Sequence, residues 1–251
     1  MERIAGSNPA GPIIFKMKLN EILKELEKGD KLLRIENMIQ EGKINERLAE
    51  GLLLQSPLSE KEVIEIVNDI KKEFYQRHGL EFPDYKIEYV DSKNLDTIAG
   101  TTDIFTKTIT LPNNQGLIIP VTLAHELAHS YQMENSVLYQ KFKELNEDKN
   151  YKEMIYVGNR TSCLTEGWAT FVSKIYAEIR DERIGKNVYL NLLKEKNNFV
   201  TFVYLLSNDP KYYGYDEGCR LFEKIYEKNG FNITCKLAQA LISDDVLKAY
   251  V

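Results

Sequence analysis

Apolar residues recur at helical spacing along most of the chain, beginning with its first third. From residue 18 to about residue 55, aliphatic side chains alternate with charged ones at intervals of three and four. Breaks at Gly29-Asp30 and Gly42 divide this region into three short predicted helices. The region contains no histidine or cysteine, so we expect it to pack against the rest of the protein or to cover a cleft.

A longer helix and then strands are predicted to follow. Ser59 and Glu62 have the spacing of a capping box at the start of a helix that Gly79 ends. The period then changes to two at Lys86 to Val90, and two β-rich pieces between 97 and 111 suit a hairpin or adjacent antiparallel strands.

The clearest alternation in this region is Thr108 to Leu111. It fits an ordinary sheet strand, and it equally fits an edge strand that pairs with an extended peptide beside a cleft.

Helical spacing resumes after Pro120, a residue that suits the first turn of a helix. The pattern predicts one buried face and one face that looks into a cleft. The two faces are Ala124, Leu127, Ala128 and Tyr131 on one side, and Thr122, His125, His129 and Gln132 on the other. Further helices are predicted at about 137–145, 162–182, 187–207, 215–229 and 232–243, with Gly185, Asn208-Asp209-Pro210 and Gly230 between the last four.

These patterns predict an α+β protein with a small mixed or antiparallel sheet, one helix beside it and a helical C-terminal lobe. We expect a flexible leader at 1–16, an N-terminal helical extension at 17–56 and a main domain at 57–251. The main domain would divide into a sheet-containing part, 57–133, and a helical part, 134–251.

The amino-acid composition limits the kinds of molecule that the protein is expected to bind. The chain has 251 residues and a net charge of −5, so it has no basic excess with which to bind nucleic acid. Apolar runs are all shorter than the roughly 18 residues that a membrane span needs. Cys163, Cys219 and Cys235 have no metal-binding or redox spacing and are expected to be reduced and buried. Together with the lack of a signal peptide, they favour a cytoplasmic protein.

The candidate chemistry lies in His125-Glu126-Leu127-Ala128-His129. Residues four apart on a helix share one face, so His125 and His129 can bind one metal ion. Glu126 lies roughly 100° further round the helix, where it can reach a water on that ion as a general base but is badly placed to bind the ion itself. The alternative is an ordinary amphipathic helix with two solvated histidines.

A catalytic zinc ion needs a third protein ligand and one open position. His78 is expected at a helix C-terminus, where the helix dipole favours it, and not on a metal. Glu166, at the start of a later predicted helix, is either the third ligand or an exposed first-turn glutamate. The small Gly167 and Ala169 would let its helix approach another closely. Thr170, one turn later, is a weaker candidate for supporting the ligands.

Together, the histidine motif and Thr165-Glu166-Gly167-Trp168-Ala169 resemble the gluzincin metallopeptidases, in particular the aminopeptidase N family and peptidase MA-like domains. The resemblance implies a zincin-like fold and one Zn²⁺ per chain, bound by His125, His129 and Glu166. Tyr215-Asp216-Glu217-Gly218 is similar to the family's Tyr-x-x-Gly segment, which implies that Tyr215 stabilises the oxyanion. Tyr212 and Tyr213 are alternative donors, and all three tyrosines could serve in packing.

Two departures from the family shape the expected activity. The interval from His129 to Glu166 is long, which implies an inserted element, and the family's exopeptidase motif has no match near Ala99 to Asp103. We therefore expect a zinc metallopeptidase that acts on peptides or proteins, with endopeptidase action favoured over aminopeptidase action. The alternatives are a silent or autoinhibited metallopeptidase-like binding domain and a zinc hydrolase of a non-peptide amide or ester.

Overall fold

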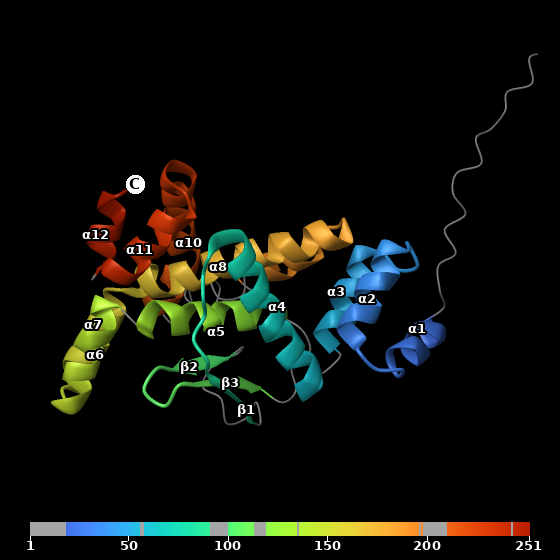
Figure 1. Ribbon diagram of the computed structural model, residues 1–251, viewed down its shortest axis with the longest axis horizontal. Coiled ribbons are helices and arrows are strands. Elements are labelled where there is room, and N and C mark those ends of the chain that lie inside the picture. The colour runs from blue at the N-terminus through green and yellow to red at the C-terminus, as the bar shows by residue number, and fades with distance from the viewer. Residues whose placement is uncertain are drawn as a thin grey trace, which may run out of the picture.

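The computed structural model consists mainly of helices, with one three-stranded sheet at one side, next to α5 (Ile119–Glu134) (Figure 1). It describes residues 19–55, 58–90, 100–112, 119–134, 136–195, 197, 210–241 and 243–251, with only the backbone for residues 19, 54, 55, 119 and 210–213. The predicted leader, 1–16, lies outside these residues. No helix in the described part of the chain is long and apolar enough to cross a membrane.

The four N-terminal helices form where the spacing of apolar residues predicts them. The Ser59 hydroxyl accepts a hydrogen bond from the backbone N–H of Glu62, whose carboxylate accepts one from Ser59 N–H, so the capping box is present. Gly79 ends the helix in the left-handed conformation, with φ 65°. The bounds are α1 Leu19–Leu26, α2 Lys31–Gln40, α3 Glu46–Gln55 and α4 Glu60–His78.

The sheet is mixed, and its strand order is β1-β3-β2. β1 (Lys86–Val90) pairs with β3 (Thr108–Pro112) in parallel, and β2 (Thr101–Asp103) pairs with β3 antiparallel. The hairpin and the alternating strand are therefore confirmed. The edge-strand interpretation of Thr108 to Leu111 is wrong, because neighbours on both sides occupy the hydrogen-bonding groups of β3. The strand beside α5 is β2, whose free side is an edge within the described residues.

Helix α5 (Ile119–Glu134) carries the histidine motif and is buried on almost all sides. The expected division into a buried face and a cleft face is wrong for Thr122 and Gln132, which are 1% and 0% exposed. Both lie inside the molecule because α5 is enclosed by α4, the sheet and α8. Only part of the polar face, including His125 and His129, reaches the pocket described below.

Two helices occupy the interval between His129 and Glu166. α6 (Val137–Glu147) matches the predicted helix there, and α7 (Tyr151–Asn159) follows as an unpredicted one. An extra element was expected in this interval, and these two helices lie there, at one end of the molecule (Figure 1). α7 has no buried residue.

The C-terminal part is helical as expected, with different boundaries. Pro210 does not separate two helices but begins one, because proline fits a first helical turn. The predicted helix 187–207 is helical at 188–195 and 197, and the rest of it lies outside the described residues. The last predicted helix, 232–243, matches α11, and α12 follows it as an unpredicted helix. The bounds are α8 Ser162–Ile184, α10 Pro210–Asn229, α11 Phe231–Ala240 and α12 Asp244–Ala249.

Three side chains fix how α5 lies against α8. Trp168 Nε1 donates to Ala128 O at 3.1 Å. Gln132 Nε2 donates to Leu164 O at 3.0 Å, and Ser173 Oγ donates to Val121 O at 2.9 Å. Later residues of α5 thus face earlier residues of α8, so the helices are antiparallel. Each buried bond satisfies a polar group and sets the register between the two helices.

The N-terminal helices pack against the far end of α8. Arg180 Nη2 and the Tyr189 hydroxyl donate to Glu36 Oε1 of α2, at 2.5 and 2.6 Å. Gln40 Nε2 donates to Arg183 O at 2.6 Å. These contacts bury the charge of Arg180 with its partner, and they confirm a packing role for this region.

The N-terminus of α8 is capped by a residue from the end of the described chain. Asp244 accepts hydrogen bonds from the backbone N–H groups of Leu164 at 2.8 Å and Cys163 at 3.1 Å. Thr161, at the N-cap position, makes no side-chain capping bond. The Asp244 carboxylate therefore satisfies amide groups that the first turn of a helix leaves without partners.

Glycines let α8 and α10 touch backbone to backbone. A Cβ built on Gly167 would lie 2.4 Å from Gly218 Cα, and a Cβ on Gly218 would lie 2.2 Å from Cys163 O. Gly214 meets Ser162 O in the same way, at 2.2 Å. The expectation that Gly167 permits a close helix approach is confirmed.

We expect Gly218→Ala to lower the free energy of unfolding by about 1–3 kcal/mol, because the added methyl group must push the two backbones apart. Chemical denaturation measures this change. The control is Gly51→Ala on α3, where nothing lies within 4 Å of the added Cβ. That variant should gain roughly 0.5–1 kcal/mol from helix propensity. Equal stability of Gly218→Ala and the wild type would contradict the close contact.

Candidate metal centre

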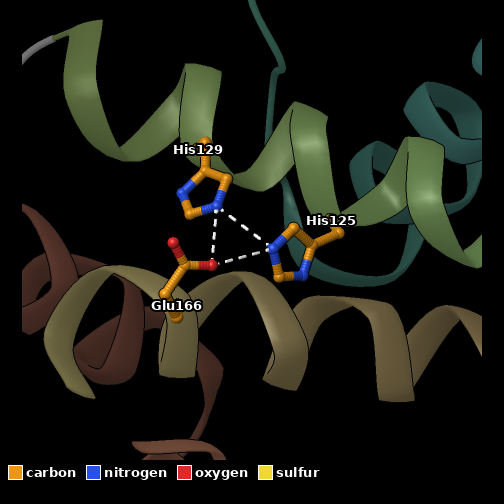
Figure 2. Close-up of side chains that lie close together, drawn as sticks. All are labelled: His125, His129 and Glu166. Atoms are coloured by element: carbon orange, nitrogen blue, oxygen red, sulfur yellow. Dashed lines mark hydrogen bonds and ion pairs between the residues drawn. The ribbon is translucent and has the colours of Figure 1, made fainter. Parts of the chain in front are cut away.

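Two imidazole rings from α5 and one carboxylate from α8 converge on a single point (Figure 2). His125 Nε2 and His129 Nε2 lie 3.1 Å apart. Glu166 Oε2 lies 3.2 Å from the first and 3.4 Å from the second. His125 and Glu166 are buried, and His129 is partly exposed. The spacing of the motif on α5 and the register of α8 bring the three atoms together.

The triangle fits a metal ion better than it fits a hydrogen-bonded cluster. Ligand atoms at normal distances from a tetrahedral zinc ion stand about 3.3–3.5 Å apart, close to the separations here. A neutral imidazole carries one proton, which cannot serve two neighbours well at once. A cation accepts lone pairs from all three atoms together. The described residues therefore fit a zinc ion, with two nitrogens and one oxygen as ligands.

The two histidines favour the charged form of the Glu166 carboxyl. Burial raises the pKa of this carboxyl, but the charge of His129 and hydrogen bonds with both rings outweigh burial. The net result is a pKa well below the usual range. The interpretation of Glu166 as an exposed first-turn glutamate is wrong, because its side chain is buried and its carboxylate lies against the His125 ring.

Glu126 points toward the sheet edge, where β2 holds it. The Thr102 hydroxyl lies 2.8 Å from Glu126 Oε2 and 3.0 Å from the backbone oxygen of the same residue. Its single proton is better placed on the carboxylate, which is the stronger acceptor. A Cβ on Gly100 would lie 3.4 Å from Glu126 Oε1, so the start of β2 closes over this carboxylate.

Tyr215 lies beside the metal ligands. Its ring stacks on that of His125, with the ring centroids 5.3 Å apart and the planes 6° from parallel. Because α10 begins at Pro210, Tyr215 stands in the second turn and not at the head of the helix. The side chains of Tyr212 and Tyr213 lie outside the described residues. The structure thus brings Tyr215 to the site, on the helix that the glycines hold against α8.

All five candidate residues line one pocket of about 500 Å³. Its walls come from β2 and the following turn, from α5 to α8 in order, and from Tyr215. The sequence did not indicate two of its features. Thr102 stands in a short strand with no recognisable motif, and the α7 wall comes from a segment whose apolar residues give only a weak helical pattern.

Other candidates stay away from the site. His78 ends α4, as predicted, and its ring stacks on Phe231 with ring centroids 3.9 Å apart. Burial and the charge of Arg77 lower its pKa. The three cysteines are buried and unpaired with one another, as expected. Thr170 does not support the ligands, because its buried hydroxyl has no hydrogen-bond partner.

Comparisons with known proteins identify no family for this chain. No family model matches the chain, and no curated protein matches it. Among solved structures, the chain is similar to one described as "the putative lipoprotein from Colwellia psychrerythraea", with 11% sequence identity and a TM-score of 0.44. The alignment covers 92% of this chain and 54% of that one, so the chain spans about half the length of this neighbour.

We expect Glu166→Ala to weaken zinc binding at least tenfold, because it removes one of three converging ligands. Zinc titration against a competing chelator, together with metal analysis of the purified protein, measures the loss. The matched control is Glu178→Ala, an exposed glutamate on the same helix, which should bind zinc as the wild type does. Unchanged metal content in Glu166→Ala would mean that another group holds the third position.

Proposed function

We propose that this protein is a zinc metallopeptidase of the gluzincin type, with a zincin-like core around α5 and α8. The observation that carries the proposal is the convergence of His125, His129 and Glu166 in a pocket that also contains Glu126. A structural zinc site is closed by a fourth protein ligand, whereas three protein ligands leave a position for water. The described residues supply three.

The zinc ion, when bound, would lower the pKa of a coordinated water to about 7 and polarise the scissile carbonyl. Glu126 accepts the proton of the attacking water and passes it to the leaving amine. The hydrogen bond from Thr102 holds the Glu126 carboxylate in one orientation for both transfers. The Tyr215 hydroxyl donates a hydrogen bond to the oxyanion, while its ring remains stacked on His125.

The sheet edge suits an extended substrate. β2 carries Thr102 beside the general base, and its outer side has no partner strand among the described residues. A peptide that pairs with this edge would gain backbone hydrogen bonds independent of its side chains. The role that the sequence offered to Thr108–Leu111 would thus belong to the neighbouring strand.

Endopeptidase action is favoured over aminopeptidase action. An aminopeptidase needs a carboxylate to hold the free amino terminus of its substrate. The only acids among the described pocket residues are Glu126 and Glu166, and both already have roles.

Autoinhibition by the N-terminal helices is not supported either. None of the described residues from 19 to 55 lines the pocket, and Figure 1 shows α1 to α3 at the opposite end of α8 from α7.

The test is a digest of a mixed peptide library with the zinc-loaded protein, with and without chelator. We expect chelator-sensitive cleavage within peptides, and Glu126→Gln should abolish it while the zinc content stays the same, since glutamine cannot accept the proton. Cleavage by Glu126→Gln at the wild-type rate would refute the base assignment. No cleavage by the zinc-loaded wild type would refute the peptidase, and ester and amide substrates would then test a non-peptide hydrolase.

For the oxyanion, Tyr215→Phe keeps the stacked ring and removes only the hydroxyl. We expect kcat to fall about 100-fold with little change in KM, the usual size of effect when one such donor is lost. Steady-state kinetics on a cleaved peptide measure both constants. Tyr212→Phe and Tyr213→Phe are the controls, and a larger loss in either of them would move the role to that residue.

A further inference from the structure

One side of the pocket is apolar and comes from segments outside the metal-binding motifs. It adjoins the side formed by His125, Glu126 and His129 in the same cavity. The apolar residues belong to the turn after β2, the end of α5, and the inserted helices α6 and α7. They are Ile104, Phe105, Met133, Phe142, Met154 and Ile155.

The described residues on this side carry no charge that could pair with a charged substrate group. The ionisable side chains among the described pocket residues are the two histidines, Glu126, Glu166 and Tyr215, and the mechanism uses all of them. No lysine, arginine or aspartate belongs to that described set. A charged side chain held against the apolar side would lose its water without gaining a partner, which is unfavourable.

Helix α7 contributes apolar side chains without burying them in the protein. None of its residues is buried, and Ile155 is 66% exposed. Met154 lies beside Ile155 in the pocket wall and is partly exposed. A ligand in the pocket would cover apolar surface that the fold leaves open to water, and removing that surface from water favours binding.

We propose that the turn after β2 and the α6–α7 insertion form a specificity subsite for a bulky aliphatic or aromatic side chain next to the scissile bond. This inference rests on the proposed peptidase function. The segment between His129 and Glu166 then defines the substrate class, because its Phe142, Met154 and Ile155 line the cavity that also contains the metal ligands. A cavity of about 500 Å³ is large enough for one such side chain and its flanking backbone.

The test compares Ile155→Asp with Ile64→Asp. Ile64 lies on α4, is 49% exposed and does not line the pocket, so it reports what the same substitution does at an exposed helix position elsewhere. The bond that the protein cleaves is mapped first. The substrates are then quenched fluorescent peptides that differ only at the residue beside that bond. That residue is Leu, Phe, Lys or Glu.

We expect the wild type and Ile64→Asp to prefer Leu and Phe over Lys and Glu by at least tenfold in kcat/KM. Ile155→Asp should lose at least tenfold on the Leu and Phe peptides and shift its preference toward Lys, while Ile155→Lys should shift toward Glu. Opposite shifts cannot arise from a shared loss of folding. An unchanged preference in both Ile155 variants, or a wild type indifferent to this residue, would overturn the subsite.

A binding measurement separates this inference from the proposed activity. Peptides of one otherwise fixed sequence, with Leu, Phe, Lys or Glu at a single position and a fluorophore without a quencher, are titrated with Glu126→Gln protein, with and without Ile155→Asp, and fluorescence anisotropy reports binding. Selective binding of Leu and Phe peptides that depends on Ile155 supports the subsite, even if the wild type cleaves nothing. Binding without selectivity overturns the subsite, even if the wild type is an active peptidase.

Discussion

The close antiparallel packing of α5 against α8 is the constraint on which the candidate metal centre depends. A ligand triangle tolerates displacements of only a few tenths of an ångström, and its members come from two helices joined by no short loop. The bonds made by Trp168, Gln132 and Ser173 fix the register of these helices. Because all three acceptors are backbone carbonyls, the register does not depend on the conformation of any acceptor side chain.

The rest of the pocket, around α5 and α8, comes from elements that differ in how many substitutions they can accept. β2 supplies Thr102 from the edge of a sheet, and α10 supplies Tyr215 from a helix held at backbone contact by Gly218. Both elements hold their side chains firmly beside the candidate metal ligands. The α6–α7 insertion has fewer buried side chains, so its sequence can vary without disturbing the ligands. The molecule thus separates the parts that perform the proposed reaction from the part that would choose its substrate.

The sequence predicted local features well and spatial relations poorly. The capping box at Ser59 and the left-handed Gly79 depend on neighbouring residues alone, so both could be predicted. The periodicity around His125 predicted a helix, but it could not show that Thr122 would be buried, because that depends on which elements cover the helix. The order of the strands likewise depends on pairing between distant residues. The place of Glu166 beside the histidines could be predicted only because the segment around it resembles a known motif.

The capping of α8 by Asp244 has a consequence during synthesis. The amide groups of Cys163 and Leu164 receive their acceptor from a residue about 80 positions later in the chain. While residue 244 is still inside the ribosome, the first turn of α8 lacks this cap, and the Glu166 backbone is held less firmly. The turn of α8 next to Glu166 is therefore completed only after Asp244 has left the ribosome, so the three residues of the candidate metal site come together late in synthesis.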